Sequence, residues 1–216
     1  MESGKPYPVP AIEIRRELIV VNSRFVATLA PVFSVEEAKA FIARVKNELL
    51  GASHHVPVYL IGHGDTLIAH CSDAGEPSGT AGRPALAVLQ GSGLGDVAVV
   101  ISRYFGGTLL GTGGLVRAYS ESVRMVVKDV PRAMKILTHT EMLGCHYRYL
   151  ERIRLLVEAC HGQTLAEDFS AEVTLTIRLA VENLQPFQDS LRELSNGVLQ
   201  VEIIETGKFL QPIRNE

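Results

Sequence analysis

The sequence lacks the features that most quickly assign a protein to a secreted, disulfide-bonded or membrane class. Its 216 residues include three cysteines, an odd number without a CxxC pair, so we expect buried thiols in a reducing compartment. No uninterrupted apolar run reaches the roughly eighteen residues of a membrane span. The first residues have neither the basic start nor the apolar stretch of a signal peptide, so we expect a cytoplasmic protein.

Short motifs of several enzyme classes are missing as well. There is no GKS or GKT, no GxSxG, no HxH and no HExxH, and Gly111-Thr112-Gly113 lacks the third glycine of a dinucleotide fingerprint. His54-His55, Ser78 and Asp73 are residue types of nucleophilic catalysis, but no mechanistic spacing joins them. We therefore expect no catalytic residues, no metal and no cofactor, and an enzyme remains only an alternative.

Charge is low overall and unevenly distributed. The net charge of −3 argues against a generally adhesive nucleic-acid binder. Residues 1–135 hold 14 Lys and Arg against 12 Asp and Glu, which gives +2, and residues 136–216 hold 7 against 12, which gives −5. Any contact with phosphate is therefore expected in the first part of the chain, where it would be sensitive to salt.

Hydrophobic periodicity predicts an α+β protein of two domains, 1–135 and 136–216, with the boundary at a break around Pro131. In the first domain we expect strands at 13–22, 24–30, 55–62, 66–72 and 97–102 and helices at 35–50, from about Thr80, and at 113–128. Ser34-Val35-Glu36-Glu37 reads as a capping box. In the second we expect strands at 136–145, 163–170, 172–180 and 198–206 and helices at 150–161 and 184–194. That β-α-β-β-α-β order is the ferredoxin-like plan.

Two glycine-rich stretches hold the candidate site: residues 72–84 (SDAGEPSGTAGRP) and 103–119 (RYFGGTLLGTGGLVRAY). Ordered glycine indicates positive φ angles or a close partner, although tight turns and packing alone would also account for it. Each stretch runs into a helix, whose free N–H groups favour anions. The candidate binding residues are Asp73, Gly75, Glu76, Ser78, Gly79, Thr80, Arg83, Arg103, Tyr104, Gly106, Gly107, Gly111, Gly113, Gly114 and Arg117.

A phosphate-binding role is predicted for the second stretch. We expect the backbone N–H groups around 106–107 and 113–114 to receive a phosphate, and Arg103 and Arg117 to neutralise its charge, because an arginine fork suits phosphate geometry. Tyr104 and Phe105 are candidates for stacking on bases, but alternation in a strand leaves at most one of them outside the core.

A structural role is predicted for the carboxylates of the first stretch. Asp73 and Glu76 bracket Gly75, and we expect them to order the loop that faces the phosphate site. Carboxylates facing the phosphate would repel it, so Glu76 is expected to point toward an arginine or a backbone N–H. The alternative uses of such a cluster are a metal bound by oxygen ligands or simple capping of a turn.

At these two stretches the sequence resembles the YigZ/IMPACT family, whose hallmarks look like SDDGEPxGTAGxP and RYxGGxxLGxGGLxRAY. The resemblance covers roughly residues 10–128, and the second domain is similar to that of the bacterial two-domain members. The chain departs from the family pattern at Ala74, where a second Asp is usual, at Leu109, where many members have a basic residue, and at His55-Val56, where Asn-Cys is common.

The resemblance implies both a fold and a function. The first domain would be an α/β sandwich like that of a ribosomal small-subunit protein, of the fourth domain of elongation factor G and of the GHMP kinases. The second would resemble the ferredoxin-like third and fifth domains of that factor. Eukaryotic relatives regulate translation during amino-acid starvation by binding the activator of a stress kinase. No catalytic residue is carried over.

The expected function is therefore that of a non-enzymatic protein that binds RNA or the ribosome through its glycine loops and regulates translation. Two alternatives remain open on the sequence. One is an enzyme of phosphoryl transfer or hydrolysis that acts on a small phosphate compound in the same cleft. The other is a protein–protein adaptor. The sequence does not specify the oligomeric state.

Overall fold

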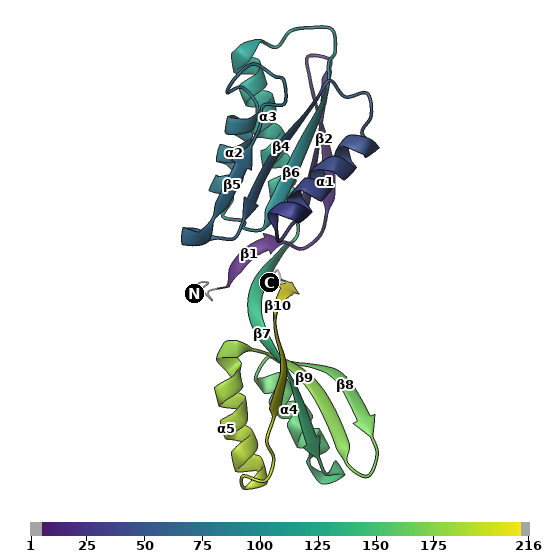
Figure 1. Cartoon of the computed structure of the whole chain (residues 1–216), viewed down its shortest axis with the longest axis vertical. Coiled ribbons are helices and arrows are strands. Elements are labelled where there is room, and N and C mark those ends of the chain that lie inside the picture. The colour runs from purple at the N-terminus through teal and green to yellow at the C-terminus, as the bar shows by residue number, and fades with distance from the viewer. Residues whose placement is uncertain (1–5, 213–216) are drawn as a thin grey trace. The chain divides into compact units, whose positions relative to one another are not determined.

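The computed structural model describes residues 6–212, and the chain divides into two compact units, residues 7–134 and 135–210 (Figure 1). The α+β class with two units is confirmed. Among the described residues, no helix combines the length and the apolar content that crossing a bilayer requires. Each unit has its own hydrophobic core and is described separately.

The first unit is built on a five-stranded antiparallel sheet. Its strand order is β2-β3-β6-β4-β5, formed by β2 (Ile14–Val20), β3 (Ser23–Pro31), β6 (Val97–Tyr104), β4 (His54–Ile61) and β5 (Ile68–Cys71). A short 3₁₀ turn, η1 (Gly64–Thr66), joins β4 to β5. The preceding strand β1 (Tyr7–Pro10) pairs with β7, described below.

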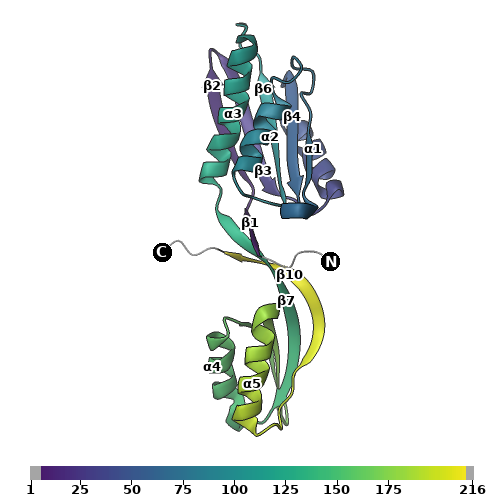
Figure 2. The same ribbon diagram turned by 90° about the vertical axis from the view of Figure 1, so that its left-hand side faces the viewer.

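Helices cover both faces of this sheet (Figures 1 and 2). They are α1 (Val35–Glu48), α2 (Gly82–Gly91) and α3 (Gly111–Asp129). Strand alternation separates the faces: Ala27 and Val99 pack in the cluster that contains α2 and α3, and Ala98 and Val100 pack in the cluster that contains α1. The sandwich expected from the sequence is therefore present.

The expected start of α1 is also present, with one change. The Glu37 N–H donates to the Ser34 hydroxyl at 3.0 Å, as in a capping box. The Glu37 carboxylate, however, accepts the N–H of Phe33 at 2.8 Å, one residue earlier than the N-cap. Two backbone donors are satisfied at the helix start, so α1 begins at Val35.

The second unit has the expected β-α-β-β-α-β order. Its elements are β7 (Arg132–Cys145, whose first residues belong to the first unit), α4 (Leu150–Ala159), β8 (Gln163–Phe169), β9 (Val173–Ala180), α5 (Leu184–Ser195) and β10 (Glu202–Pro212), with 3₁₀ turns η2 (Tyr147–Tyr149) and η3 (Val181–Asn183). β7 pairs with β9 and β10, and β8 pairs with β9 at the end of the order. The β8–β9 ladder contains a register shift between Thr164 and Ala166.

The last strand begins later than predicted, at Glu202 and not at Val198. Asn196 has a φ of 53° and ends α5 in the left-handed conformation. The N–H of Val198 then donates to the Ser195 carbonyl at 3.3 Å, and the N–H of Leu199 donates to the Ser195 hydroxyl at 3.0 Å. These donors close the helix end, so residues 198–201 lie outside the strand.

Candidate functional site

The first glycine stretch is organised by Asp73. Its carboxylate accepts the N–H groups of Gly79 at 2.8 Å, Ala81 at 3.1 Å and Gly82 at 2.8 Å. Burial alone would raise the pKa of Asp73, but these three hydrogen bonds and the nearby Arg83 charge outweigh it and lower the pKa. The start of α2 thus already holds an anion, supplied by the protein itself.

Asp73→Ala is expected to lower the free energy of unfolding by about 2 kcal/mol, since it leaves a helix start and a loop without their acceptor. Urea unfolding at neutral pH measures this, with Ser78→Ala, an exposed change in the same loop, as the control. Because the folded-state pKa of Asp73 lies below its ordinary value of 3.8, the contribution is complete above that pH and is lost as the pH falls through the folded pKa. A difference between Asp73→Ala and wild type that did not shrink at low pH would contradict this role.

Glu76 is the centre of a buried polar cluster. Its Oε1 accepts Arg103 Nη1 at 2.8 Å and the Tyr119 hydroxyl at 2.6 Å, and Arg103 Nη2 lies 3.4 Å from the Ser23 hydroxyl. We call these four residues the Glu76 cluster. The exposed fractions are 8% for Glu76, 5% for Arg103 and zero for Tyr119. Burial, followed by the hydrogen bond to Glu76 and its charge, raises the pKa of Tyr119, so the phenol stays protonated.

This arrangement corrects the role that we expected for Arg103. Its guanidinium is buried and its charge is neutralised by Glu76, so it is not open to a phosphate. The cause is strand alternation: Arg103 follows Val97, Val99 and Ile101 on the face of β6 that the α2–α3 layer covers, and it lies opposite Phe25 of β3. The expectation for Glu76, that it points toward an arginine, agrees with this geometry.

The role expected for Gly106 is corrected in the same way. Its N–H donates to the Ser23 hydroxyl at 3.3 Å and is not free for a ligand. A Cβ at this position would lie 2.1 Å from the carbonyl carbon of Asn22, so only glycine permits the β2–β3 turn to approach the loop. Gly106 is therefore a packing residue.

The start of α3 is organised differently from the start of α2. No side chain in the described part of the chain caps it, and Gly111, Thr112 and Gly113 are exposed. The first N–H groups of a helix have no intrahelical acceptor, so these donors face solvent. Arg117, one turn later, is exposed and forms no ion pair with the residues between 6 and 212. We call this region, residues 105–117, the α3 entrance.

Gly113 is a glycine that the fold itself does not require. Its φ is not positive, and a Cβ built there would meet no heavy atom within 4 Å. Gly111, by contrast, has a φ of 68°, which an L side chain rarely adopts. Glycine lowers helix stability by about 1 kcal/mol relative to alanine. Neither packing nor backbone conformation accounts for this loss of helix stability at Gly113.

The aromatic pair next to this helix lies outside the core, although alternation was expected to place one of the two rings inside it. Phe105 is 49% exposed. Tyr104 is partly buried, with the Arg24 guanidinium 4.1 Å from its ring centroid. Phe105 is the more exposed of the two rings; the Arg103 guanidinium lies over it, 5.7 Å from the ring centroid, and the 86% exposed Leu109 is in the same loop.

The remaining candidates occupy several environments. Gly75, Ser78, Arg83 and Gly107 are exposed, Gly79 and Gly114 are partly buried, and Thr80 is buried with its hydroxyl 2.7 Å from the Pro77 carbonyl. Tyr119 and Ser23 were not among the candidates, although both lie in segments that carry the family resemblance. The stretches 72–84 and 103–119 thus come together through Glu76, Arg103 and Tyr119 of the Glu76 cluster, and not through a shared phosphate pocket.

The residue types of nucleophilic catalysis are not assembled with one another. His54 Nδ1 lies 2.9 Å from the Ala74 carbonyl, and His55 Nδ1 lies 2.8 Å from the Ser102 hydroxyl, which is fully buried. Both Asp73 oxygens accept backbone N–H groups. Within the described chain, no three His, Cys, Asp or Glu residues are grouped so that they could hold a metal.

Comparisons with known proteins match both units. A family model described as Impact N-terminal domain matches residues 21–127, and one described as Domain of unknown function (DUF1949) matches residues 143–198. An IMPACT family member of Haemophilus influenzae is 37% identical over 203 residues, which are 94% of this chain and 98% of that protein. IMPACT family member YigZ of Escherichia coli is 38% identical over 198 residues, 91% of this chain and 97% of that protein.

A solved structure described as that of a hypothetical protein is similar over 95% of this chain and 98% of its own, with 37% identity and a TM-score of 0.62. Together with the match to the Impact N-terminal domain and the two bacterial relatives, these similarities extend over nearly the whole sequence. The chain therefore belongs to the IMPACT family.

Proposed function

We propose that this protein is a non-enzymatic regulator of translation that binds RNA, on or off the ribosome, through the α3 entrance of its first unit. The proposal is carried by three observations on residues 6–212: α3 starts without a side-chain cap, Arg117 is exposed and forms no ion pair, and neither backbone conformation nor neighbouring atoms demand the glycine at position 113. Arg103 and Gly106 are not part of this revised site.

Electrostatics at the α3 entrance favours a phosphate. The start of a helix carries about half a positive charge on its free N–H groups. Side chains on a helix lean toward its N-terminus, so Arg117 covers the turn that contains Gly113, four residues earlier. A phosphate at this turn would receive both the backbone donors and the guanidinium, whose donors match its oxygens.

Gly113 adds a steric argument. A glycine in the first turn leaves the backbone without a Cβ, so a ligand can approach more closely than a side chain would permit. The binding energy of such a ligand offsets the helix stability that glycine costs. The α2 start offers no such space, because the Asp73 carboxylate already occupies its donors. The two helix starts therefore differ in function, although both follow a glycine stretch.

Phe105 favours RNA over a small phosphate compound. An exposed aromatic ring in a loop that leads to a phosphate site suits the stacking of an unpaired base, which contributes about 1–3 kcal/mol per base. The exposed Leu109 in the same loop adds apolar surface that a base could contact. Since residues 136–216 carry a net charge of −5, contact with the phosphate backbone is assigned to the first unit.

The translational part of the proposal extends to this chain the role that the family resemblance implies for eukaryotic members. Ribosomes present exposed RNA loops and single strands, which are the forms that stacking surfaces bind. Co-sedimentation of the full chain with ribosomes, with and without RNase treatment, separates an RNA contact from a contact with ribosomal protein.

Arg117→Ala is expected to weaken binding to a fluorescein-labelled oligouridylate by about tenfold and to reduce the slope of log K against log salt by about 0.7, the value for one lost contact with a single strand. Fluorescence anisotropy at two salt concentrations measures both quantities. Arg192→Ala, an exposed arginine on α5, is the matched control and should leave both unchanged. Superimposable isotherms for Arg117→Ala and wild type at both salt concentrations would reject the site.

Gly113→Ala separates the fold from the ligand. The free protein should become more stable by about 0.5–1 kcal/mol, because alanine favours the helix and the space is open. Oligouridylate binding should weaken at the same time, because the methyl group occupies the position of the phosphate. Stabilisation without any loss of binding would leave Gly113 outside the site.

A further inference from the structure

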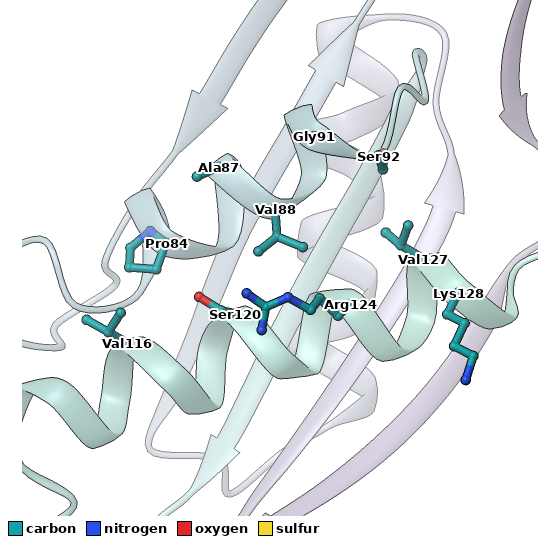
Figure 3. Close-up of a pocket in the computed structure, with 10 residues that line it drawn as sticks. All are labelled: Pro84, Ala87, Val88, Gly91, Ser92, Val116, Ser120, Arg124, Val127 and Lys128. Carbon is teal, nitrogen blue, oxygen red and sulfur yellow. The ribbon is translucent and has the colours of Figure 1, made fainter.

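A groove separates α2 from α3 on the surface of the first unit (Figure 3). Its volume is about 680 Å³. The ten residues that line it are Pro84, Ala87, Val88, Gly91 and Ser92 on one side and Val116, Ser120, Arg124, Val127 and Lys128 on the other. These residues define what we call the α2–α3 groove, and none of them belongs to the Glu76 cluster.

The walls of the groove are mostly apolar, and its α2 side includes two small residues. Val88 and Val127 provide branched side chains, and Val116 is 36% exposed. Ala87 and Gly91 are one turn apart on α2, and a Cβ at Gly91 would meet no atom within 4 Å. Small residues at this spacing let the backbone of another helix approach closely.

The polar groups of the groove have one sign of charge. Arg124 and Lys128 are cationic, and none of the ten lining residues is acidic. Figure 3 shows the Arg124 guanidinium extending along α3 toward the Ser120 hydroxyl. The Ser120 hydroxyl has no hydrogen-bond partner in the described chain. Glu121 contacts Arg124 at 3.0 Å, but both side chains are more than half exposed, so this pair is weak and exchangeable.

We propose that the α2–α3 groove binds an amphipathic helix of a partner protein, with an apolar stripe flanked by Glu or Asp. The stripe would pack on the valines and over Ala87 and Gly91, and a carboxylate would receive the free donors of Arg124 and Ser120. From Val116 to Lys128 the groove extends for about 18 Å, which matches about three helical turns. The apolar walls disfavour RNA, whose backbone is charged throughout.

This inference does not depend on the α3 entrance. Gly113 and Arg117 lie on the same face of α3 as Ser120 and Arg124, seven residues earlier, and Val116 belongs to both regions. The groove, however, also uses α2 and recognises another ligand class, so the inference stands if oligouridylate fails to bind. The chemistry recognised is that of an acidic amphipathic helix, and the test uses designed peptides of that kind.

Three fluorescein-labelled helical peptides of about fifteen residues share one Leu/Ala stripe and differ only in the flanking residues, which are Glu, Gln or Lys. Anisotropy with the full chain should give the order Glu, then Gln, then Lys, with about tenfold between the first two. Arg124→Glu should weaken binding of the Glu peptide at least tenfold and favour the Lys peptide. Ala87→Phe, which fills the groove, should abolish binding.

Matched controls carry the same changes elsewhere. Arg192→Glu reverses the charge of an exposed helical arginine that also has an acidic residue three positions earlier, and Ala40→Phe enlarges an exposed alanine on α1. Both should bind the Glu peptide like the wild type. Circular dichroism verifies that all four variants are folded, and amide chemical shifts of the full chain should move at Val88 and Ser120 when the Glu peptide is added.

Several outcomes would overturn the proposal. These are an absence of peptide binding up to about 1 mM, equal affinity for the Glu and Lys peptides, or full affinity in Arg124→Glu. Self-association of the chain that Ala87→Phe abolishes, without binding of the Glu peptide, would assign the groove to a second copy. Shifts of the same amides by oligouridylate would assign it to nucleic acid.

Discussion

Arg103→Ala is expected to lower the free energy of unfolding by about 3–5 kcal/mol, because it leaves the buried Glu76 carboxylate without its cation. Within the described residues, the Glu76 carboxylate would keep only the hydrogen bond from the Tyr119 hydroxyl, and one neutral donor does not balance a full negative charge. Urea denaturation at neutral pH measures the loss. Arg117→Ala, which removes an exposed arginine fourteen positions along, should change stability by less than about 0.5 kcal/mol.

A double-mutant cycle separates the ion pair from simple packing. Replacing Glu76 and Arg103 together by Leu and Met should destabilise less than the sum of the two single changes, since no unpaired charge remains. Tyr119→Phe should lower the free energy of unfolding by about 1–3 kcal/mol by removing a hydrogen bond to a charged group. If Arg103→Ala were nearly neutral for stability but weakened RNA binding, Arg103 would instead be the exposed phosphate ligand that the sequence led us to expect.

Glu141→Gln is expected to stabilise the second unit at alkaline pH. Glu141 lies on β7, opposite Ile177 of β9, with no exposed surface, and neither of its carboxylate oxygens has a hydrogen-bond partner in the described chain. Burial raises the pKa of Glu141 to about 7 from an ordinary value of 4.5. Gln resembles the protonated acid and never acquires the charge, so it removes the penalty.

The pH dependence follows from proton linkage. Between pH 4.5 and about 7 the folded state keeps a proton that the unfolded chain releases, so the free energy of unfolding falls as the pH rises. The full loss is at most about 3 kcal/mol. Urea unfolding should therefore give similar stabilities for Glu141→Gln and wild type below pH 4.5 and a clear advantage of the variant at about pH 8. Glu205→Gln, on the exposed surface of β10, is the control; an equal gain there would exclude Glu141 as the cause.

Local sequence signals were sufficient for most of the fold. The capping box at Ser34 and the alternating strands each act within a few residues, so the element order could be predicted. The start of β10 could not, because the Ser195 hydroxyl and carbonyl capture the N–H groups of residues 198–199. That competition depends on how α5 ends in three dimensions.

The candidate site remains a prediction, and the chemistry expected of one of its residues, Arg103, was wrong because Glu76 neutralises its guanidinium in the core. The pairing of Glu76 with Arg103 joins residues 27 positions apart across the core, and nothing in their spacing indicates it. A signal was nevertheless present: Arg103 continues the odd-numbered apolar positions of β6, which face inward. Gly106 and Gly113 look alike in the sequence, and only the position of Asn22 distinguishes a packing glycine from an open one.

The shift between Thr164 and Ala166 has a consequence for the behaviour of the second unit in concentrated solution. An outermost strand with a regular hydrogen-bonding edge invites the edge of another molecule, and ladders then grow from copy to copy. At β8 the extra residue, Leu165, interrupts the row of donors and acceptors, and the exposed Asp168 follows it with negative charge, whereas Glu167 is neutralised by Arg154. The β8 edge is therefore expected to resist pairing with a strand of another copy of the chain.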